Sequence, residues 1–213
     1  MTKQCFFVAG IVCLMLGFGS CSKSATSYFP LDQGRVWTYQ ISMKMPFGGE
    51  RNVTMTLTNL APRQLDGKTV TPQKMELQFQ GESKYSFMYF AEGPGGVVNV
   101  ADQDSGDVKP IIVNPPSYVL KKPIKTGTAW ATTLNPANTH SGPAKATIES
   151  TDETVDVPAG TFKQCVMIHI AGNSKQSAGQ DEYQWFAPSV GMIKVIDKGA
   201  GPFSSMVLKS FKK

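Results

Sequence analysis

Apolar and polar residues alternate with a period of two along much of this chain, and no other feature constrains its fold as strongly. At the start of one stretch, Trp37, Tyr39 and Ile41 alternate with Thr38 and Gln40. Similar segments recur near residues 53–57, 75–79, 85–89, 97–100, 147–155, 162–171, 182–186, 192–197 and 204–211. Side chains two residues apart share one face of a strand, and no window sustains a helical repeat. The sequence therefore predicts an all-β domain.

The two halves of the chain share a pattern that indicates an internal duplication. Residues 30–37, P-L-D-Q-G-R-V-W, match residues 123–130, P-I-K-T-G-T-A-W, at an offset of 93. At that offset the turn glycine Gly67 meets Gly160, and at an offset of 96 Tyr89 meets Trp185. Three anchors in the same order predict pseudo-repeats over residues 30–122 and 123–213.

Short strands separated by turn residues also predict the architecture. They are typical of an antiparallel meander, whose two halves form either facing sheets or one curved or closed barrel. Between the halves, residues 109–123 contain Pro110, Pro115, Pro116 and Pro123. Proline donates no hydrogen bond to a central strand, so we expect a crossover connection there.

The N-terminus has the layout of a secretory signal. Lys3 precedes an apolar run from Cys5 to Phe18, which at ~1.5 Å per residue reaches ~21 Å and falls short of a ~30 Å hydrocarbon core. The segment L-G-F-G-S-C ending at Cys21 resembles the lipidation site of exported bacterial lipoproteins. The resemblance implies cleavage before Cys21, several acyl chains on that residue and, from Ser22, sorting to the outer membrane facing the periplasm. We expect a signal peptide over 1–20, a flexible tether over 21–27 and one domain over 28–213.

Cysteine content and charge narrow the possible partners. If residues 1–20 are removed and Cys21 carries lipid, Cys165 is the one remaining cysteine, so no intramolecular disulfide is expected. The formal net charge of +5 comes from scattered lysines, which we interpret as solvated surface. We expect the membrane as a partner through the lipid, and no nucleic acid.

Metal ligands and catalytic groups are few. Cys165, Met167 and His169 alternate on one strand and would suit copper, but a metal site needs ligands that converge from other elements. There is no nucleophile motif, and the other histidine, His140, lies in a loop-like segment. We expect no metal, no cofactor and no enzymatic activity.

An acidic turn is the second metal candidate. Asp102, Asp104 and Asp107 suggest an oxygen-rich calcium loop. An EF-hand loop would need an acid or amide at Gly106 and a glutamate at Val113, so the pattern favours a solvated turn.

Aromatic and methionine side chains in the first half form a candidate ligand wall, consisting of Trp37, Tyr39, Met43, Met55, Phe87 and Tyr89. Methionine adapts to irregular partners, so such a wall could line a cavity for an apolar ligand. A packed core accounts for the same pattern.

Three longer motifs resemble a group of poorly characterised bacterial lipoproteins: Y-F-P-L-x-x-G-x-x-W-x-Y at 28–39, V-P-A-G-T-F at 157–162 and W-F-A-P-x-x-G at 185–191. That resemblance brings no established activity. We expect an exported, lipid-anchored envelope lipoprotein that binds a partner protein or envelope component without catalysis. The alternatives are a carrier or sensor of an apolar ligand in a β-barrel cavity and an unrecognised hydrolase.

Overall fold

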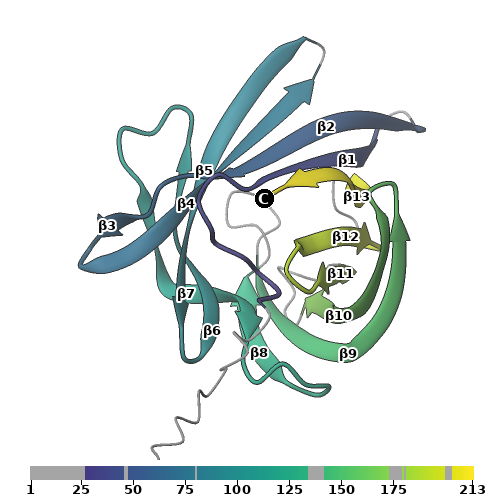
Figure 1. The fold of residues 1–213 in the computed structure, drawn as a ribbon. Coiled ribbons are helices and arrows are strands. Elements are labelled where there is room, and N and C mark those ends of the chain that lie inside the picture. Colours follow the sequence, from purple (N-terminus) through teal and green to yellow (C-terminus); the bar gives the residue numbers. More distant parts are fainter. Residues whose placement is uncertain are drawn as a thin grey trace, which may run out of the picture.

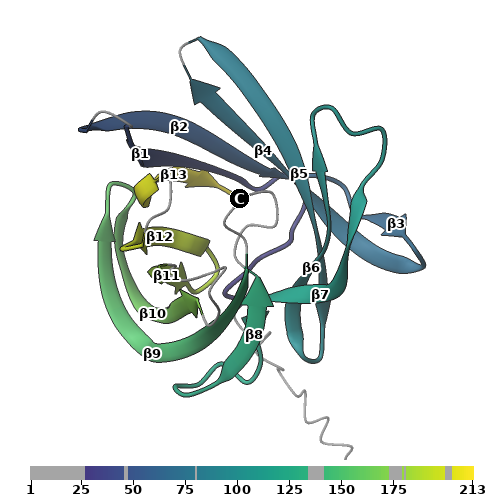
Figure 2. The same ribbon diagram turned by 180° about the vertical axis from the view of Figure 1, so that it is seen from behind.

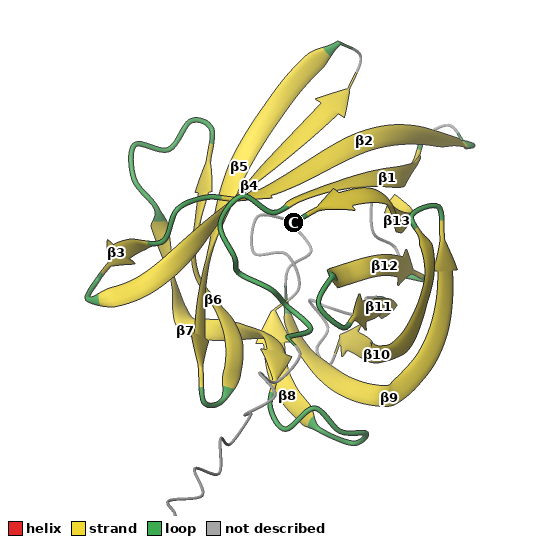
Figure 3. Ribbon diagram, in the orientation of Figure 1, coloured by secondary structure: helices red, strands yellow, loops and turns green. Residues whose placement is uncertain are grey.

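The computed structural model describes residues 27–45, 48–79, 81–133, 142–172, 179, 181–199 and 203–213, and within these every regular element is a β-strand (Figure 3). The strands are β1 (Val36–Lys44), β2 (Glu50–Asn59), β3 (Arg63–Leu65), β4 (Lys68–Phe79), β5 (Glu82–Gly93), β6 (Gly96–Asp104), β7 (Ile111–Lys121), β8 (Ala129–Thr133), β9 (Pro143–Val157), β10 (Gly160–Gly172), β11 (Asp181–Ala187), β12 (Gly191–Asp197) and β13 (Phe203–Lys212). Among these described residues, nothing forms a helix of the length and apolar character needed to cross a membrane. The all-β prediction is confirmed.

The strands form one antiparallel sheet that follows the path β7-β6-β5-β4-β2-β1-β13-β12-β11-β10-β9-β8, with β3 paired to β4 beside it. The N- and C-terminal strands pair with each other, from Val36 opposite Lys212 to Met43 opposite Phe203. The path then curls until β7 and β8 lie next to each other, giving a nearly closed barrel (Figures 1 and 2).

The barrel has a seam between β7 and β8, because none of the described ladders joins these two strands. Side chains bridge it instead: the Trp130 indole N–H donates to the Tyr118 carbonyl oxygen at 2.9 Å, and the Ser117 and Thr132 hydroxyl oxygens lie 3.0 Å apart. The seam thus lies between the last strand of the first half and the first strand of the second.

The expectation of a crossover connection over residues 109–123 is wrong, because β7 occupies most of that range. The register with β6 jumps from Asn99 opposite Ser117 to Ala101 opposite Ile112, and Pro115 and Pro116 fall within the jump. A strand at a seam tolerates proline where no ladder hydrogen bond is required of it.

The two halves contribute strands in the same order. The first half supplies β1, β2, β4, β5, β6 and β7, and the second supplies β8 to β13. Tyr89 and Trp185, matched in the sequence, fall on the corresponding strands β5 and β11. Both buried tryptophans that begin a repeat, Trp37 and Trp130, donate their indole N–H to a backbone carbonyl of the opposite half. A full superposition of the halves stays a prediction.

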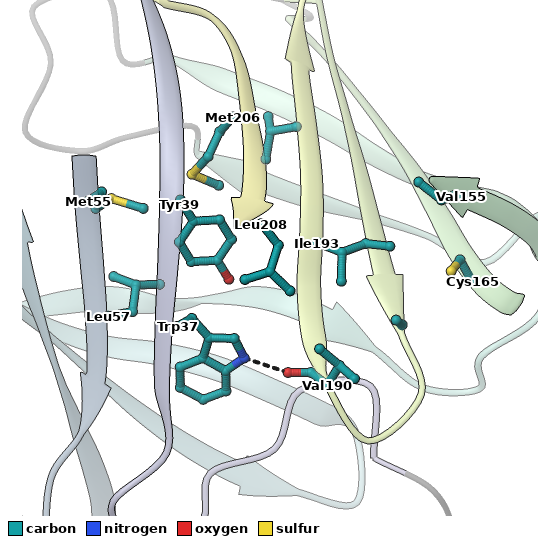
Figure 4. Close-up of a cluster of buried hydrophobic side chains, with 12 residues drawn as sticks. Trp37, Tyr39, Met55, Leu57, Val155, Cys165, Val190, Ile193, Met206 and Leu208 are labelled. Carbon is teal, nitrogen blue, oxygen red and sulfur yellow. Dashed lines mark hydrogen bonds between the residues drawn. The ribbon is translucent and has the colours of Figure 1, made fainter. Parts of the chain in front are cut away.

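The meander places alternate turns at opposite ends of the barrel. We call the near rim the end that holds residues 27–35 and the turns β5–β6, β7–β8, β9–β10 and β11–β12. The far rim holds the turns β1–β2, β4–β5, β6–β7 and β12–β13. Between the rims, buried side chains form three clusters, of which the largest lies among β1, β2, β12 and β13 (Figure 4).

Candidate functional site

The residues predicted to line a ligand wall do not share one location. Trp37, Tyr39 and Met55 are buried together in the largest cluster, and Tyr39 on β1 lies opposite Met55 on β2 (Figure 4). Met43 lies on the same strand toward the far rim, opposite Arg51. Trp37, Tyr39 and Met55 fill the interior, and their burial is what a packed core produces, whereas Met43 is half-buried.

The polar atoms of the two buried aromatic residues are engaged by backbone. The Trp37 indole N–H donates to the Val190 carbonyl oxygen at 2.7 Å, and the Tyr39 hydroxyl donates to the Met192 carbonyl oxygen at 2.8 Å. Burial raises the pKa of Tyr39 far above its usual range. Both residues therefore hold β1 to the β11–β12 turn and the strand after it.

Phe87 and Tyr89 lie on the other face of the sheet. Phe87 pairs with Lys74 rather than with Met75, which packs against the largest cluster. Tyr89 is buried in a separate cluster with Val70, and its hydroxyl hydrogen-bonds with Gln103 Oε1 at 2.6 Å. The structure thus divides the predicted wall between two sides of one sheet.

Residues 27–30, which continue the chain from Cys21, are hydrogen-bonded to the near rim, and Cys21 itself lies outside the described residues. The Ser189 N–H donates to the Ser27 carbonyl oxygen at 2.8 Å, and the Tyr28 hydroxyl donates to the Gln164 carbonyl oxygen at 3.0 Å. Next along the chain, Asn59 Nδ2 donates to the Pro30 carbonyl oxygen at 3.0 Å. The chain is fixed to the near rim from Ser27 onward.

A small pocket opens beside this segment. It encloses about 110 Å³, and its walls include Ser27, Phe29, Leu120, Lys122 and Ile124. Ligand sites for drug-sized molecules usually enclose ~300–1,000 Å³, so this pocket holds at most a small group.

The far rim exposes apolar side chains that the sequence analysis missed. Val108 is fully exposed, and Ile111 and Ile112 are 63% and 46% exposed at the β6–β7 turn. Phe79 and Tyr85 at the β4–β5 hairpin and Met45 at the β1–β2 turn are also exposed. The three turns follow one another along the sheet (Figure 1). Apolar residues on both sides of Lys109-Pro110 were a sequence signal for this surface.

The side chains proposed for copper do not form a metal site. Cys165 is fully buried, and burial raises its pKa to about 11, which disfavours the thiolate that a metal would bind. Within the described residues, no group of three or more histidine, cysteine or acidic side chains is placed to hold an ion. In the acidic turn, Asp107 accepts from the Asp104 N–H at 2.8 Å, and Asn99 donates to Asp102 at 2.7 Å.

His169 is held on the outer face of β10 by two carboxylates. Nδ1 lies 3.0 Å from Glu149 and Nε2 lies 2.8 Å from Asp181, so the ring can donate to both partners only as imidazolium. The ring also stacks on Tyr183, with centroids 4.4 Å apart. Both nitrogens are thus occupied, and neither is placed to accept a proton from a nucleophile. His140 lies outside the described residues.

Among the described residues, Glu182 has the most strongly raised carboxyl pKa. It lies on the same face of β11 as Gln184 and Phe186, facing the interior near the far rim, and Gln184 Nε2 donates to its Oε1 at 2.5 Å. Burial, with a smaller contribution from Asp197, raises the pKa of Glu182 to about 7. Glu182 and Phe186 are four residues apart on one strand, so their side chains share a face. This spacing was the sequence signal that Glu182 faces the interior.

Comparisons with known proteins complete this description. No family model and no curated protein matches the chain. It is similar to a solved protein from Parabacteroides distasonis ATCC 8503 that is proposed to be a lipoprotein, with 16% identity, a TM-score of 0.43 and coverage of 88% of this chain and 99% of that one. A protein from Bacteroides fragilis NCTC 9343, proposed to be exported and to have a YmcC-like fold, matches at 15% identity, a TM-score of 0.43 and coverage of 88% and 100%.

Proposed function

We propose that this protein is a lipid-anchored lipoprotein of the cell envelope that binds a partner protein, without catalysis, through the exposed apolar turns of its far rim. The anchor is the lipidation motif at Cys21, and Ser22 favours the outer membrane facing the periplasm. The observation that carries the binding function is the exposure of Val108, Ile111 and Ile112 at the rim opposite the N-terminal segment.

The position of this surface suits a tethered interaction module. The N-terminal segment emerges at the near rim, so an anchor at Cys21 leaves the far rim directed away from the membrane. Exposed apolar residues at adjacent turns contribute little to the isolated fold. Buried in a complex, each can contribute ~1–2 kcal/mol.

The other candidate functions receive less support from the geometry. A carrier of apolar ligands needs an interior cavity, whereas the aromatic and methionine side chains of β1 and β2 are packed in a core cluster. A hydrolase needs a base beside a nucleophile, whereas both nitrogens of His169 are engaged by carboxylates.

The anchor is tested by replacing its acceptor. Cys21→Ala should move the protein from the membrane fraction to the soluble envelope fraction, and Cys165→Ala serves as the matched cysteine control that stays in the membrane. If the Cys21→Ala protein remains membrane-bound, the anchor assignment is wrong.

The binding surface is tested by native mass spectrometry of the acylated protein extracted gently from its own envelope. We expect protein subunits on the wild type and loss of most of that signal in Ile111→Ser/Ile112→Ser. An exposed near-rim change, Thr126→Ala, should leave the complex intact. A small-molecule adduct would favour the carrier, and a bare monomer would contradict the interaction module.

A further inference from the structure

The distance between the anchor and the barrel is short. Residues 22–26 separate Cys21 from Ser27, the first described residue. At ~3.3–3.6 Å per residue, six steps along an extended chain span only about 20 Å. The Ser27 carbonyl oxygen accepts a hydrogen bond from the Ser189 N–H. The tether can therefore become longer only if that hydrogen bond breaks and the residues after Ser27 leave the barrel.

The near rim carries lysines close to the point where the tether enters. Lys122 shares a pocket wall with Ser27, and its ammonium nitrogen lies 3.2 Å from Glu92, an ion pair in which both side chains are 47% exposed. Lys121 precedes it with its ammonium 5.3 Å from the Tyr118 ring centre. Lys125 follows in the same turn, is exposed and forms no ion pair with another described residue.

Other lysines of the near rim add to its positive charge. Lys163, next to the Gln164 that binds Tyr28, and the C-terminal Lys212 are exposed. Acids lie there as well: Asp32 is engaged by Arg35 at 2.7 Å, Asp156 accepts a hydrogen bond from Thr161, and Asp152, near Tyr28, is exposed.

The far rim carries charges of both signs, with Lys44, Lys84, Lys109 and Lys198 exposed there. Among its acids, Glu82, Asp104 and Asp107 lie at the turns, and Asp181 and Asp197 lie where β11 and β12 meet the rim. The lysines around the tether place positive charge within reach of an anionic leaflet, and their attraction to it acts over a Debye length of ~8 Å at physiological salt.

From this geometry we infer that the near rim docks on anionic phospholipid, with Lys121, Lys122 and Lys125 against lipid phosphates. The docking rests on the proposed anchor at Cys21, which confines the rim within reach of the leaflet. It fixes the orientation of the barrel, so that the apolar turns of the far rim face away from the membrane. Each lysine brought to an anionic leaflet favours the docked state by about fivefold.

The test uses the acylated protein reconstituted in vesicles, with the acetylation rate of each lysine read by mass spectrometry. In vesicles of phosphatidylethanolamine and phosphatidylglycerol, Lys122 and Lys125 should react at least about fivefold more slowly than in vesicles of phosphatidylcholine, and high salt should restore their rates. Lys84 and Lys109, exposed on the far rim, are internal controls whose rates should not change.

A matched pair of variants separates docking from folding. Lys122→Glu/Lys125→Glu should remove the lipid-dependent protection of Lys121, and Lys84→Glu/Lys109→Glu should retain it. Equal rates in both vesicles, or equal slowing on the far rim, would overturn the docking while leaving the anchor in place. Failure of the acylated protein to float with either vesicle would overturn both the anchor and the docking.

Discussion

Replacing Glu182 by glutamine should remove a pH dependence from the stability of the barrel. Glutamine keeps the shape of the side chain and an oxygen that can accept the hydrogen bond from Gln184. It cannot ionise, so it removes the cost of placing a carboxylate in the interior.

The size of the effect follows from the pKa. The folded protein holds the Glu182 proton up to about pH 7, whereas the unfolded chain releases it near the ordinary value of 4.5. Between those two pH values unfolding releases a proton, so the stability contributed by this group falls as pH rises. At ~1.4 kcal/mol per pH unit, the loss across that window is about 3 kcal/mol.

The assay is urea denaturation of wild type and Glu182→Gln at pH 5 and at pH 8. The two proteins should differ little at pH 5, and the variant should be more stable by about 2–3 kcal/mol at pH 8. Other titrating groups act in both proteins and cancel in the difference. Glu92→Gln, which removes an exposed ion pair, should change stability by no more than ~0.5 kcal/mol at either pH. A difference between wild type and Glu182→Gln that does not grow with pH would refute the argument.

Two further predictions concern the packing of the barrel. Gly96→Ala should destabilise the fold by about 2–4 kcal/mol in the same assay, because Gly96 has φ +127° and an added Cβ would meet the Leu120 carbonyl oxygen. Gly93→Ala is the control. Nothing lies within 4 Å of the Cβ that it would add, so it should cost less than ~1 kcal/mol. Cys165, buried and with its pKa raised to about 11, should resist a thiol reagent in the native protein and react quickly in denaturant, and rapid native modification would show that the β9–β10 hairpin opens.

The seam shows how far a repeat pattern determines closure. If the halves are equivalent, the junction of β13 with β1 corresponds to the junction of β7 with β8. The first is a full ladder, whereas the second is bridged by Trp130 and by Ser117 with Thr132. The difference lies in β7, where Pro115 and Pro116 lack N–H donors, and in the short β8. The repeat pattern thus agrees with the order of strands, whereas individual residues decide which of the two junctions forms a hydrogen-bonded ladder.

The sequence by itself determined the class of structure and the faces of its strands, because the two-residue period is a local property of an extended chain. It also predicts where an anchor would be attached, since the motif ending at Cys21 is contiguous. Tertiary structure decided what covers each face. Phe87 and Met75 are both apolar and both lie on alternating strands, yet antiparallel register places them on opposite sides of one sheet. Glu182 became an interior acid, and Ile111 an exposed apolar residue, through neighbours far away in the chain. Burial depends on contacts between residues that are far apart in the chain, and the local alternation of apolar and polar residues carries no information about those contacts.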